Sequence, residues 1–325
     1  MKIMVFGGGT GLSVLLRGLK KYTKDITAVV TVADNGGGSG ILREDLGMLP
    51  PGDMRNCITA LADVEPSMLK LLQHRFKDGY LQGQSFGNLL IAAMYEIFGD
   101  YEHALKEIGS IFRLSGKVLP MTLTDTHLKG QLENGVVIFG EKEIPIYSKN
   151  LQSQIDRIYL VPSHCEPLEE TISDIEKADI VILGPGSLYT SVIPNLMINN
   201  ISQKIYNSKC KTFYICNLMT QPGETDSFNV VDHVKAIQKH TGINIIDFVI
   251  ANDQVLCESI MKKYNQQGSA QVLIDGNQIK KLEDKNIKVI SSDFVDIKKD
   301  YVRHNSYKIG GLIEKYVLKK GHFKL

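Results

Sequence analysis

The sequence predicts an α/β fold of the Rossmann-like, doubly wound type, built on a mainly parallel sheet. Two apolar runs near the start, Ile3–Phe6 and Ile26–Ala33, have no polar face. Continuous apolar strands of this kind are typical of parallel sheets that helices cover on both sides. Between the two runs, Ser13–Lys20 has the apolar spacing of a helix. Strand, helix and strand within about thirty residues form a βαβ unit.

The same alternation of strands and helices returns in the second half of the chain. Helical patterns occupy residues of about 168–177, 187–206, 229–240 and 253–265. We expect strands at the apolar runs Ile158–Val161, Ile180–Leu183, Thr212–Cys216, Asp247–Ala251 and Gln271–Ile274. A second set of strands after the first βαβ unit is what a doubly wound sheet requires.

The middle of the chain departs from this alternation. Residues 54–113 have a mostly helical pattern, whereas residues 117–146 break it, with apolar and polar side chains alternating over Met121–Leu132. Directly after the alternating part, Asn134-Gly135 is a strong hairpin signal. We therefore predict a single α/β domain, residues 1–325, with a helical and antiparallel β-hairpin insertion at about residues 54–146.

The composition excludes several classes of protein. The 325 residues include 37 Lys and Arg against 36 Asp and Glu, a net charge of +1, which excludes a globally basic nucleic-acid binder. The five cysteines form no C-x-x-C pair, so neither a disulfide framework nor a cysteine zinc site is expected. No apolar stretch approaches the roughly 18 residues of a membrane span. We expect a soluble, cytoplasmic protein.

The first glycine-rich loop, Gly7–Gly11, lies between the first predicted strand and its helix. Backbone amides and the helix dipole make such a place an anion site, and glycine lets a phosphate approach. A tight turn is the alternative, but four glycines in five residues exceed what a turn needs. A dinucleotide-binding dehydrogenase is disfavoured because Leu12 replaces the third fingerprint glycine. The candidate binding residues are Gly8, Gly9, Thr10 and Gly11.

A second glycine-rich loop, Asp34–Gly40, follows the second predicted strand. Loops after adjacent parallel strands face one crevice, so the two loops together indicate a ligand with several phosphates or with a phosphate and a sugar. A flexible surface turn is the alternative. The candidate binding residues here are Asp34, Asn35, Gly37, Gly38 and Ser39.

The segment Pro50–Asn56 brings a carboxylate, a guanidinium and an amide together at a predicted helix start. Asp53, Arg55 and Asn56 are its candidate residues. Asp53 alone would be interpreted as a helix cap, but after two phosphate-type loops it becomes a partner of Asp34 for Mg²⁺. Magnesium prefers carboxylate oxygens that it shares with ligand phosphates.

Three further polar loops interrupt apolar stretches at 83–88, 184–190 and 217–225. Two of them follow predicted parallel strands, whose loops gather at the ligand-binding edge of a sheet. Each loop alone is compatible with ordinary turn chemistry. The candidate binding residues are Asn88, Gly186, Ser187, Asn217 and Thr220.

Six stretches, GGGTGLS, ADNGGGSG, PPGDMRN, GQSFGNLLIAA, ADIVILGPGSLYTSVIPNL and CNLMTQPGET, together resemble the YvcK branch of the CofD-like proteins, also called gluconeogenesis factors or the UPF0052 group. The resemblance implies a Rossmann-like fold and a nucleotide-linked ligand. Relatives in the CofD branch are 2-phospho-L-lactate transferases that build coenzyme F420 with Mg²⁺. Members of the YvcK branch are similar instead to UDP-sugar binders, with UDP-N-acetylglucosamine the favoured ligand, and are needed for cell shape on gluconeogenic carbon.

The resemblance also implies roles for single residues. Tyr264 would stack on uracil, Arg303 would pair with the diphosphate, and Asn88 and Asn217 would orient polar groups of the ligand. A tyrosine at the core edge and a surface arginine are equally compatible with the residues themselves. The expected partners are a UDP-sugar, further copies of the chain and cell-wall regulatory proteins.

The sequence departs from the transferase pattern, which has an acidic, glycine-poor second loop and a P-D-x-D-T segment. The first hypothesis is therefore a non-catalytic UDP-sugar-binding factor. A Mg²⁺-dependent, phospholactate-type transferase using Asp34 and Asp53 is the alternative.

Overall fold

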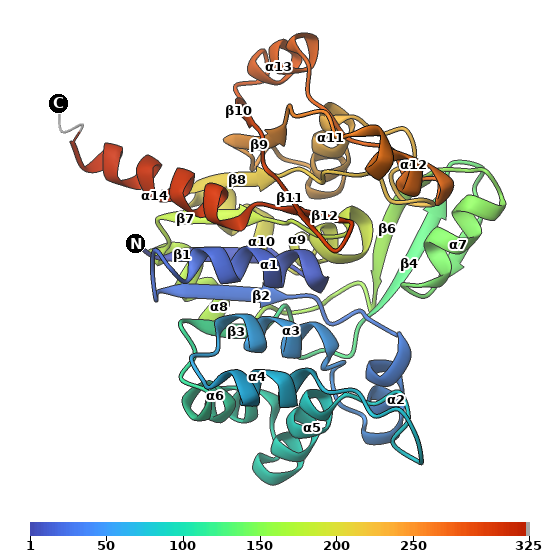
Figure 1. Ribbon diagram of the computed structural model, residues 1–325, viewed down its shortest axis with the longest axis vertical. Coiled ribbons are helices and arrows are strands. Elements are labelled where there is room, and N and C mark those ends of the chain that lie inside the picture. The colour runs from blue at the N-terminus through green and yellow to red at the C-terminus, as the bar shows by residue number, and fades with distance from the viewer. Residues whose placement is uncertain (323–325) are drawn as a thin grey trace.

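The centre of the computed structural model is a seven-stranded sheet whose neighbouring strands are all parallel (Figure 1). The structure describes residues 1–322, and side chains as far as 317; residues 323–325 of the expected domain lie outside the described part. The strand order is β10-β9-β8-β7-β1-β2-β3. The strands are β1 (Ile3–Gly7), β2 (Ile26–Val30), β3 (Lys117–Pro120), β7 (Ile180–Leu183), β8 (Lys211–Ile215), β9 (Phe248–Asn252) and β10 (Lys288–Ser292).

The order of the strands reverses between β1 and β7. Ile3 pairs with Ile26 of β2 on one side and with Ile180 of β7 on the other. From β1 the chain continues toward β3, and from β7 it continues toward β10. The carboxyl ends of β1 and β7 therefore lie side by side at a topological switch point, where α/β proteins bind ligands. The predicted doubly wound α/β class is confirmed.

Helices cover both faces of the sheet (Figure 1). One face carries α1 (Gly9–Leu19), α3 (Gly52–Leu61) and α14 (Ser306–His322). The other face carries α8 (Glu169–Lys177), α9 (Ile193–Leu196), α10 (Ile201–Asn207) and α11 (Val230–Thr241). Every residue of β1, β2, β7 and β9 is buried between these layers, as their continuous apolar sequences require.

The remaining helices extend the two ends of the sheet. Beyond β3 lie α2 (Gly37–Leu46), α4 (Pro66–Gln73), α5 (Phe86–Phe98) and α6 (Tyr101–Ile111), and near β9 and β10 lie α12 (Glu258–Gln266) and α13 (Gly276–Glu283). Within residues 1–322, none of the helices combines the length and the apolar character needed to cross a membrane.

A small antiparallel sheet and one helix, which together we call the antiparallel module, lie at the right of Figure 1. It consists of β4 (His127–Leu132), β5 (Val137–Phe139), α7 (Glu143–Asn150) and β6 (Ile155–Val161). The predicted hairpin at Asn134-Gly135 is confirmed, because β4 and β5 pair on either side of it.

Two strands lie in a different sheet from the one that we predicted for them. Ile158–Val161 was expected in the main sheet, but β6 pairs with β4 instead. Burial alternates along Ile158–Val161, with Ile158 and Leu160 buried and Tyr159 and Val161 half-buried, a pattern that the apolar composition of this stretch conceals. Conversely, β3 lies within the region predicted to be antiparallel, yet it joins β2 in parallel.

Other element predictions were also wrong. Gln271–Ile274 makes only an isolated bridge, between Gln271 and Met219, and the outer strand is β10. Three of the five residues of β10 are exposed and none is buried, so it lacks the apolar run that marks a buried strand. Residues 187–206 form a π-helical turn, Leu188–Val192, followed by α9 and α10, because Pro194 starts a new helix and Asn200 adopts a φ of 61°.

A final hairpin precedes α14. It consists of β11 (Val295–Lys298) and β12 (Tyr301–His304), paired antiparallel. This hairpin crosses in front of the sheet near its carboxyl edge in Figure 1 and brings β12 to the ligand-binding side of the fold.

Candidate functional site

A cavity of about 690 Å³ opens at the switch point. Its walls are the loops that follow β1, β7 and β8, together with parts of α12, β12 and the antiparallel module. A cavity of this size accommodates a nucleotide-sized ligand. The site therefore lies where the two halves of the sheet meet, as the positions of the glycine-rich loops predict.

The loop after β1 requires glycine because other residues lie directly against it. A Cβ atom on Gly8 would lie 2.6 Å from Cγ2 of Thr31 and 2.7 Å from Oδ2 of Asp53, and one on Gly11 would lie 2.9 Å from the Pro185 carbonyl oxygen. The cap residue of α1 is Gly8, which has no side chain to satisfy the amides of the first turn. Backbone amides and the positive end of the helix dipole therefore border the cavity.

Asp34 and Asp53 both line the cavity below this loop. The Gly9 amide donates a hydrogen bond to Oδ2 of Asp53 at 2.6 Å, and the Gly36 amide donates one to Oδ1 of Asp34 at 2.8 Å. Burial raises the pKa of Asp53 to about 6, and the charge of Asp34 adds to the effect while the Gly9 amide opposes it. No three Asp, Glu, His or Cys side chains of the described residues are grouped as a metal site. A cation here would therefore need ligand oxygens as well as these two carboxylates.

Tyr264 and Arg303 come to the cavity from α12 and β12. The Val302 amide donates a hydrogen bond to the Tyr264 hydroxyl at 2.8 Å, and the Tyr264 ring packs against a small apolar cluster that includes Leu218 and Val302. The Arg303 guanidinium lies 5.6 Å from the centre of the Tyr301 ring and forms no ion pair with any described side chain. Its charge is therefore available to an anionic ligand.

His304, the residue after Arg303, attaches β12 to the main sheet. Its Nε2 lies 3.0 Å from the carbonyl oxygen of Cys216 at the end of β8 and donates to it. Burial lowers the pKa of His304 to about 4, so the ring is neutral near pH 7. This bond fixes the position of the hairpin beside the cavity.

Two carboxyl groups of the site, Glu141 and Glu224, were not among the predicted residues. Glu224 is buried and accepts a short hydrogen bond from the Ser187 hydroxyl, while the Thr190 hydroxyl donates to Ser187 Oγ at 2.8 Å. Burial raises the pKa of Glu141 to about 7, and the neighbouring Thr190 hydroxyl opposes this effect. Glu224 lies in a loop that the sequence singled out, whereas Glu141 lies between β5 and α7 with no motif around it.

The structure brings most of the predicted site residues together. The cavity is lined by the predicted residues Gly8, Gly9, Thr10, Gly11, Asp34, Asp53, Gly186, Ser187, Asn217, Thr220, Tyr264 and Arg303. The predicted residues outside its lining are Asn35, Gly37, Gly38, Ser39, Arg55, Asn56 and Asn88.

Several of the residues outside the lining hold loops in place. The Arg55 guanidinium donates to the Ser85 hydroxyl at 2.7 Å and to the Asn56 side chain at 2.8 Å. Nδ2 of Asn88 donates to Ser39 Oγ at 3.4 Å. These contacts join the starts of α2, α3 and α5 behind Asp34, so they support the wall of the cavity without facing it.

Comparison with known proteins agrees with this fold. A family model described as 2-phospho-L-lactate transferase CofD matches residues 3–295. A putative gluconeogenesis factor of Thermoanaerobacterium thermosulfurigenes is 51% identical over 96% of this chain and 95% of its own length. The gluconeogenesis factor of Bacillus subtilis is 46% identical over 96% of each chain. A crystal structure of a UPF0052 family member from Bacillus halodurans superposes with a TM-score of 0.91 at 43% identity, over 96% of this chain and 99% of that one. The chain therefore belongs to the CofD family and, within it, to the UPF0052 group of gluconeogenesis factors.

Proposed function

We propose that this protein is a cytoplasmic binder of a nucleoside diphosphate sugar, with UDP-N-acetylglucosamine as its ligand, and that it acts through binding without catalysis. The observation that carries the proposal is one cavity with three kinds of wall. It contains a tyrosine ring and an arginine that forms no ion pair with a described side chain, a helix start whose cap residue is glycine, and a group of hydroxyl and carboxyl side chains. A base, a diphosphate and a sugar need these three surfaces in turn.

Each wall suits its part of the ligand for a physical reason. Tyr264 offers an aromatic face for a pyrimidine. Arg303 offers a planar fork that matches phosphate oxygens, and the amides at the start of α1 add donors that cost no side-chain entropy. The net charge of +1 agrees with an anion site made from backbone groups and one placed side chain.

The biological role that we propose is the regulation of cell shape and wall synthesis during growth on gluconeogenic carbon. The names of the relatives, gluconeogenesis factors, support the metabolic part of this role. In this scheme the protein forms homo-oligomers, and cell-wall regulatory proteins recognise its ligand-bound state.

Calorimetric titration with UDP-N-acetylglucosamine tests the proposal. We expect saturable binding that Tyr264→Ala and Arg303→Ala each weaken at least tenfold, because each removes a main contact. Lys298→Ala is the matched control, since Lys298 belongs to the same hairpin but lies outside the cavity. Absence of detectable heat at millimolar ligand would refute the proposal.

A Mg²⁺-dependent transferase is the second candidate, favoured by the match to the CofD model and by the two aspartates in the cavity. Asp34 and Asp53 would hold the ion, which supplies charge neutralisation for ligand phosphates. Transfer of a phospholactyl group to a deazaflavin acceptor, lost in Asp53→Asn, would favour this candidate. Undiminished transfer in Asp53→Asn would count against it.

A further inference from the structure

A chain of hydrogen bonds lies in one wall of the cavity, with a second carboxyl group beside it. The Thr190 hydroxyl donates to Ser187 and the Ser187 hydroxyl donates to Glu224, and Glu141 lines the same cavity next to Thr190. Thr190 and Ser187 lie at the π-helical turn after β7, and π-turns are frequent at functional sites. Glu141 comes from the antiparallel module, and Glu224 from the loop after β8. The wall is therefore assembled from three parts of the chain that are distant in sequence.

The two hydroxyl protons of this chain have known acceptors. Ser187 has one hydroxyl proton and donates it to Glu224, and Thr190 has one and donates it to Ser187. Both protons are therefore engaged within the wall, whereas the carboxyl group of Glu141 lines the cavity beside them.

This part of the cavity is rich in acceptors and poor in cations. The charges that act most strongly on Glu141 are those of Asp34 and Glu224, followed by Asp53. Neither Glu141 nor Glu224 forms an ion pair with a described side chain. Carboxyl oxygens accept hydrogen bonds from hydroxyl and amide groups, whereas they repel a phosphate, which offers no donor when it is ionised.

We propose that Glu141, Thr190 and Ser187 form a subsite for the hydroxyl groups of a sugar, and that this subsite makes the protein select nucleoside diphosphate sugars over nucleoside triphosphates. The inference rests on the proposed function, because it assigns one end of the same ligand. A sugar beyond the diphosphate donates several hydrogen bonds to this wall. A third phosphate in the same position meets the group of carboxyls instead.

The test compares UDP, UDP-N-acetylglucosamine and UTP by calorimetry at pH 8 without divalent ions. We expect the wild type to bind the sugar nucleotide at least tenfold more tightly than UDP, and UTP more weakly than UDP. Glu141→Ala removes the acceptor and should reduce the preference for the sugar nucleotide at least fivefold while UDP binding stays within twofold. Glu141→Gln keeps an acceptor but removes the charge, so it should strengthen UTP binding at least threefold.

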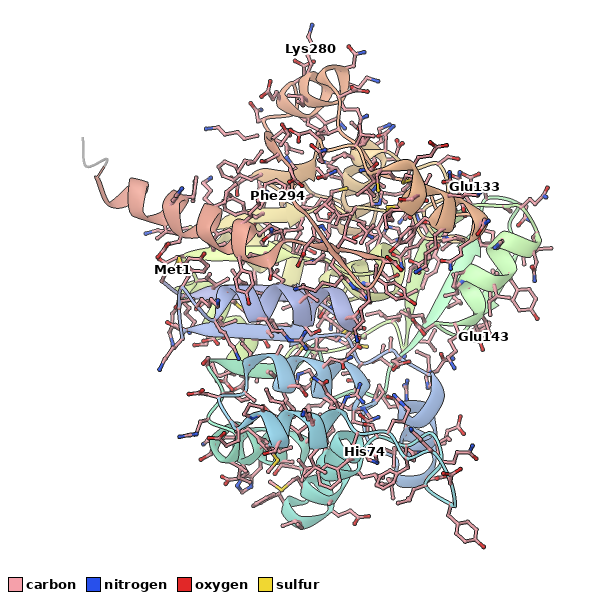
Figure 2. All side chains as sticks on the ribbon, viewed as in Figure 1. Met1, His74, Glu133, Glu143, Lys280 and Phe294 are labelled. Atoms are coloured by element: carbon pink, nitrogen blue, oxygen red, sulfur yellow. The ribbon has the colours of Figure 1, made fainter. Side chains whose placement is uncertain are left out.

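Two further variants keep the test independent of folding defects. Thr190→Val breaks the chain without removing a carboxyl and should also lower the preference for the sugar nucleotide over UDP. Glu133→Gln is the control, because Glu133 is exposed on the same antiparallel module outside this cavity (Figure 2). If UDP and the sugar nucleotide both fail to bind, the proposed function fails. If both bind and Glu141→Ala keeps the wild-type ratio, only the sugar subsite is refuted.

Discussion

Glu141 should lower the stability of the folded protein as pH rises, and Glu141→Gln should remove this effect. Burial raises the pKa of this carboxyl from 4.5 to about 7 in the folded state. Between these values the folded chain binds more protons than the unfolded chain, so stability is lost as pH rises through the window. Because one pKa unit corresponds to about 1.36 kcal/mol, this increase in the pKa lowers the free energy of unfolding at high pH by about 3 kcal/mol. That figure is an upper value because the Glu141 side chain is partly exposed.

Urea denaturation of both chains between about pH 3.5 and 8 measures the effect. The two unfolding free energies should agree near the acid end, where Glu141 is protonated in both states, and the variant should be more stable by about 2–3 kcal/mol at pH 8. Burial also raises the pKa of Asp53, but that contribution is present in both chains and cancels in the difference. Parallel pH profiles for wild type and variant would refute the reasoning, because they would mean that Glu141 ionises in the folded state as it does in the unfolded one.

Three further predictions follow from single contacts. Gly8→Ala should destabilise the protein by about 1–3 kcal/mol because its Cβ would overlap residues behind the loop. Gly276→Ala is the control, because its Cβ meets nothing within 4 Å and the thermal midpoint should change little. Equal thermal midpoints for the two variants would contradict this prediction. Tyr264→Phe leaves the ring but removes the acceptor of the Val302 amide, so hydrogen exchange in β12 should accelerate while sugar-nucleotide affinity falls less than tenfold. Among the five cysteines only Cys257 is exposed, so one thiol per native chain should react quickly with a disulfide reagent, and a second fast thiol would contradict the fold.

The sequence predicted the strands that are apolar along their whole length, and failed where tertiary position decides. Ile3–Phe6 and Ile180–Leu183 are fully buried, so their apolar composition alone predicts strands in the interior of the sheet. No residue of β10 is buried, and an edge strand with serine and lysine has no apolar run to reveal it. The apolar run of β6 predicted a strand, but its composition did not indicate to which sheet the strand belongs. Gln271–Ile274 has the composition of a strand, but only Gln271 forms a bridge, to Met219.

The site residues likewise include some that the sequence reveals and some that only the fold reveals. Glycine loops are visible in the sequence because close approach of backbones, as at Gly8 and Gly11, excludes every other residue. Glu141 has no such signature: in the stretch Gly140–Glu143 it has the composition of an exposed turn, and only the fold brings it near Asp34 and Thr190. Arg55 lies outside the cavity lining, where its Nη1 and Nη2 donate to Ser85 and Asn56, and the sequence does not reveal these partners.

Backbone groups and side chains therefore have different roles in ligand binding by this fold. The loops after β1 and β7 directly follow strands of the parallel sheet, and they present backbone groups that suit any diphosphate. The side chains that distinguish one ligand from another come from additions to that sheet: Glu141 from the antiparallel module, Tyr264 from α12 and Arg303 from β12. Backbone donors cannot be changed by substitution, whereas these three side chains can. A protein with the same sheet should therefore keep its affinity for diphosphates and change its choice of base or sugar first at these three positions.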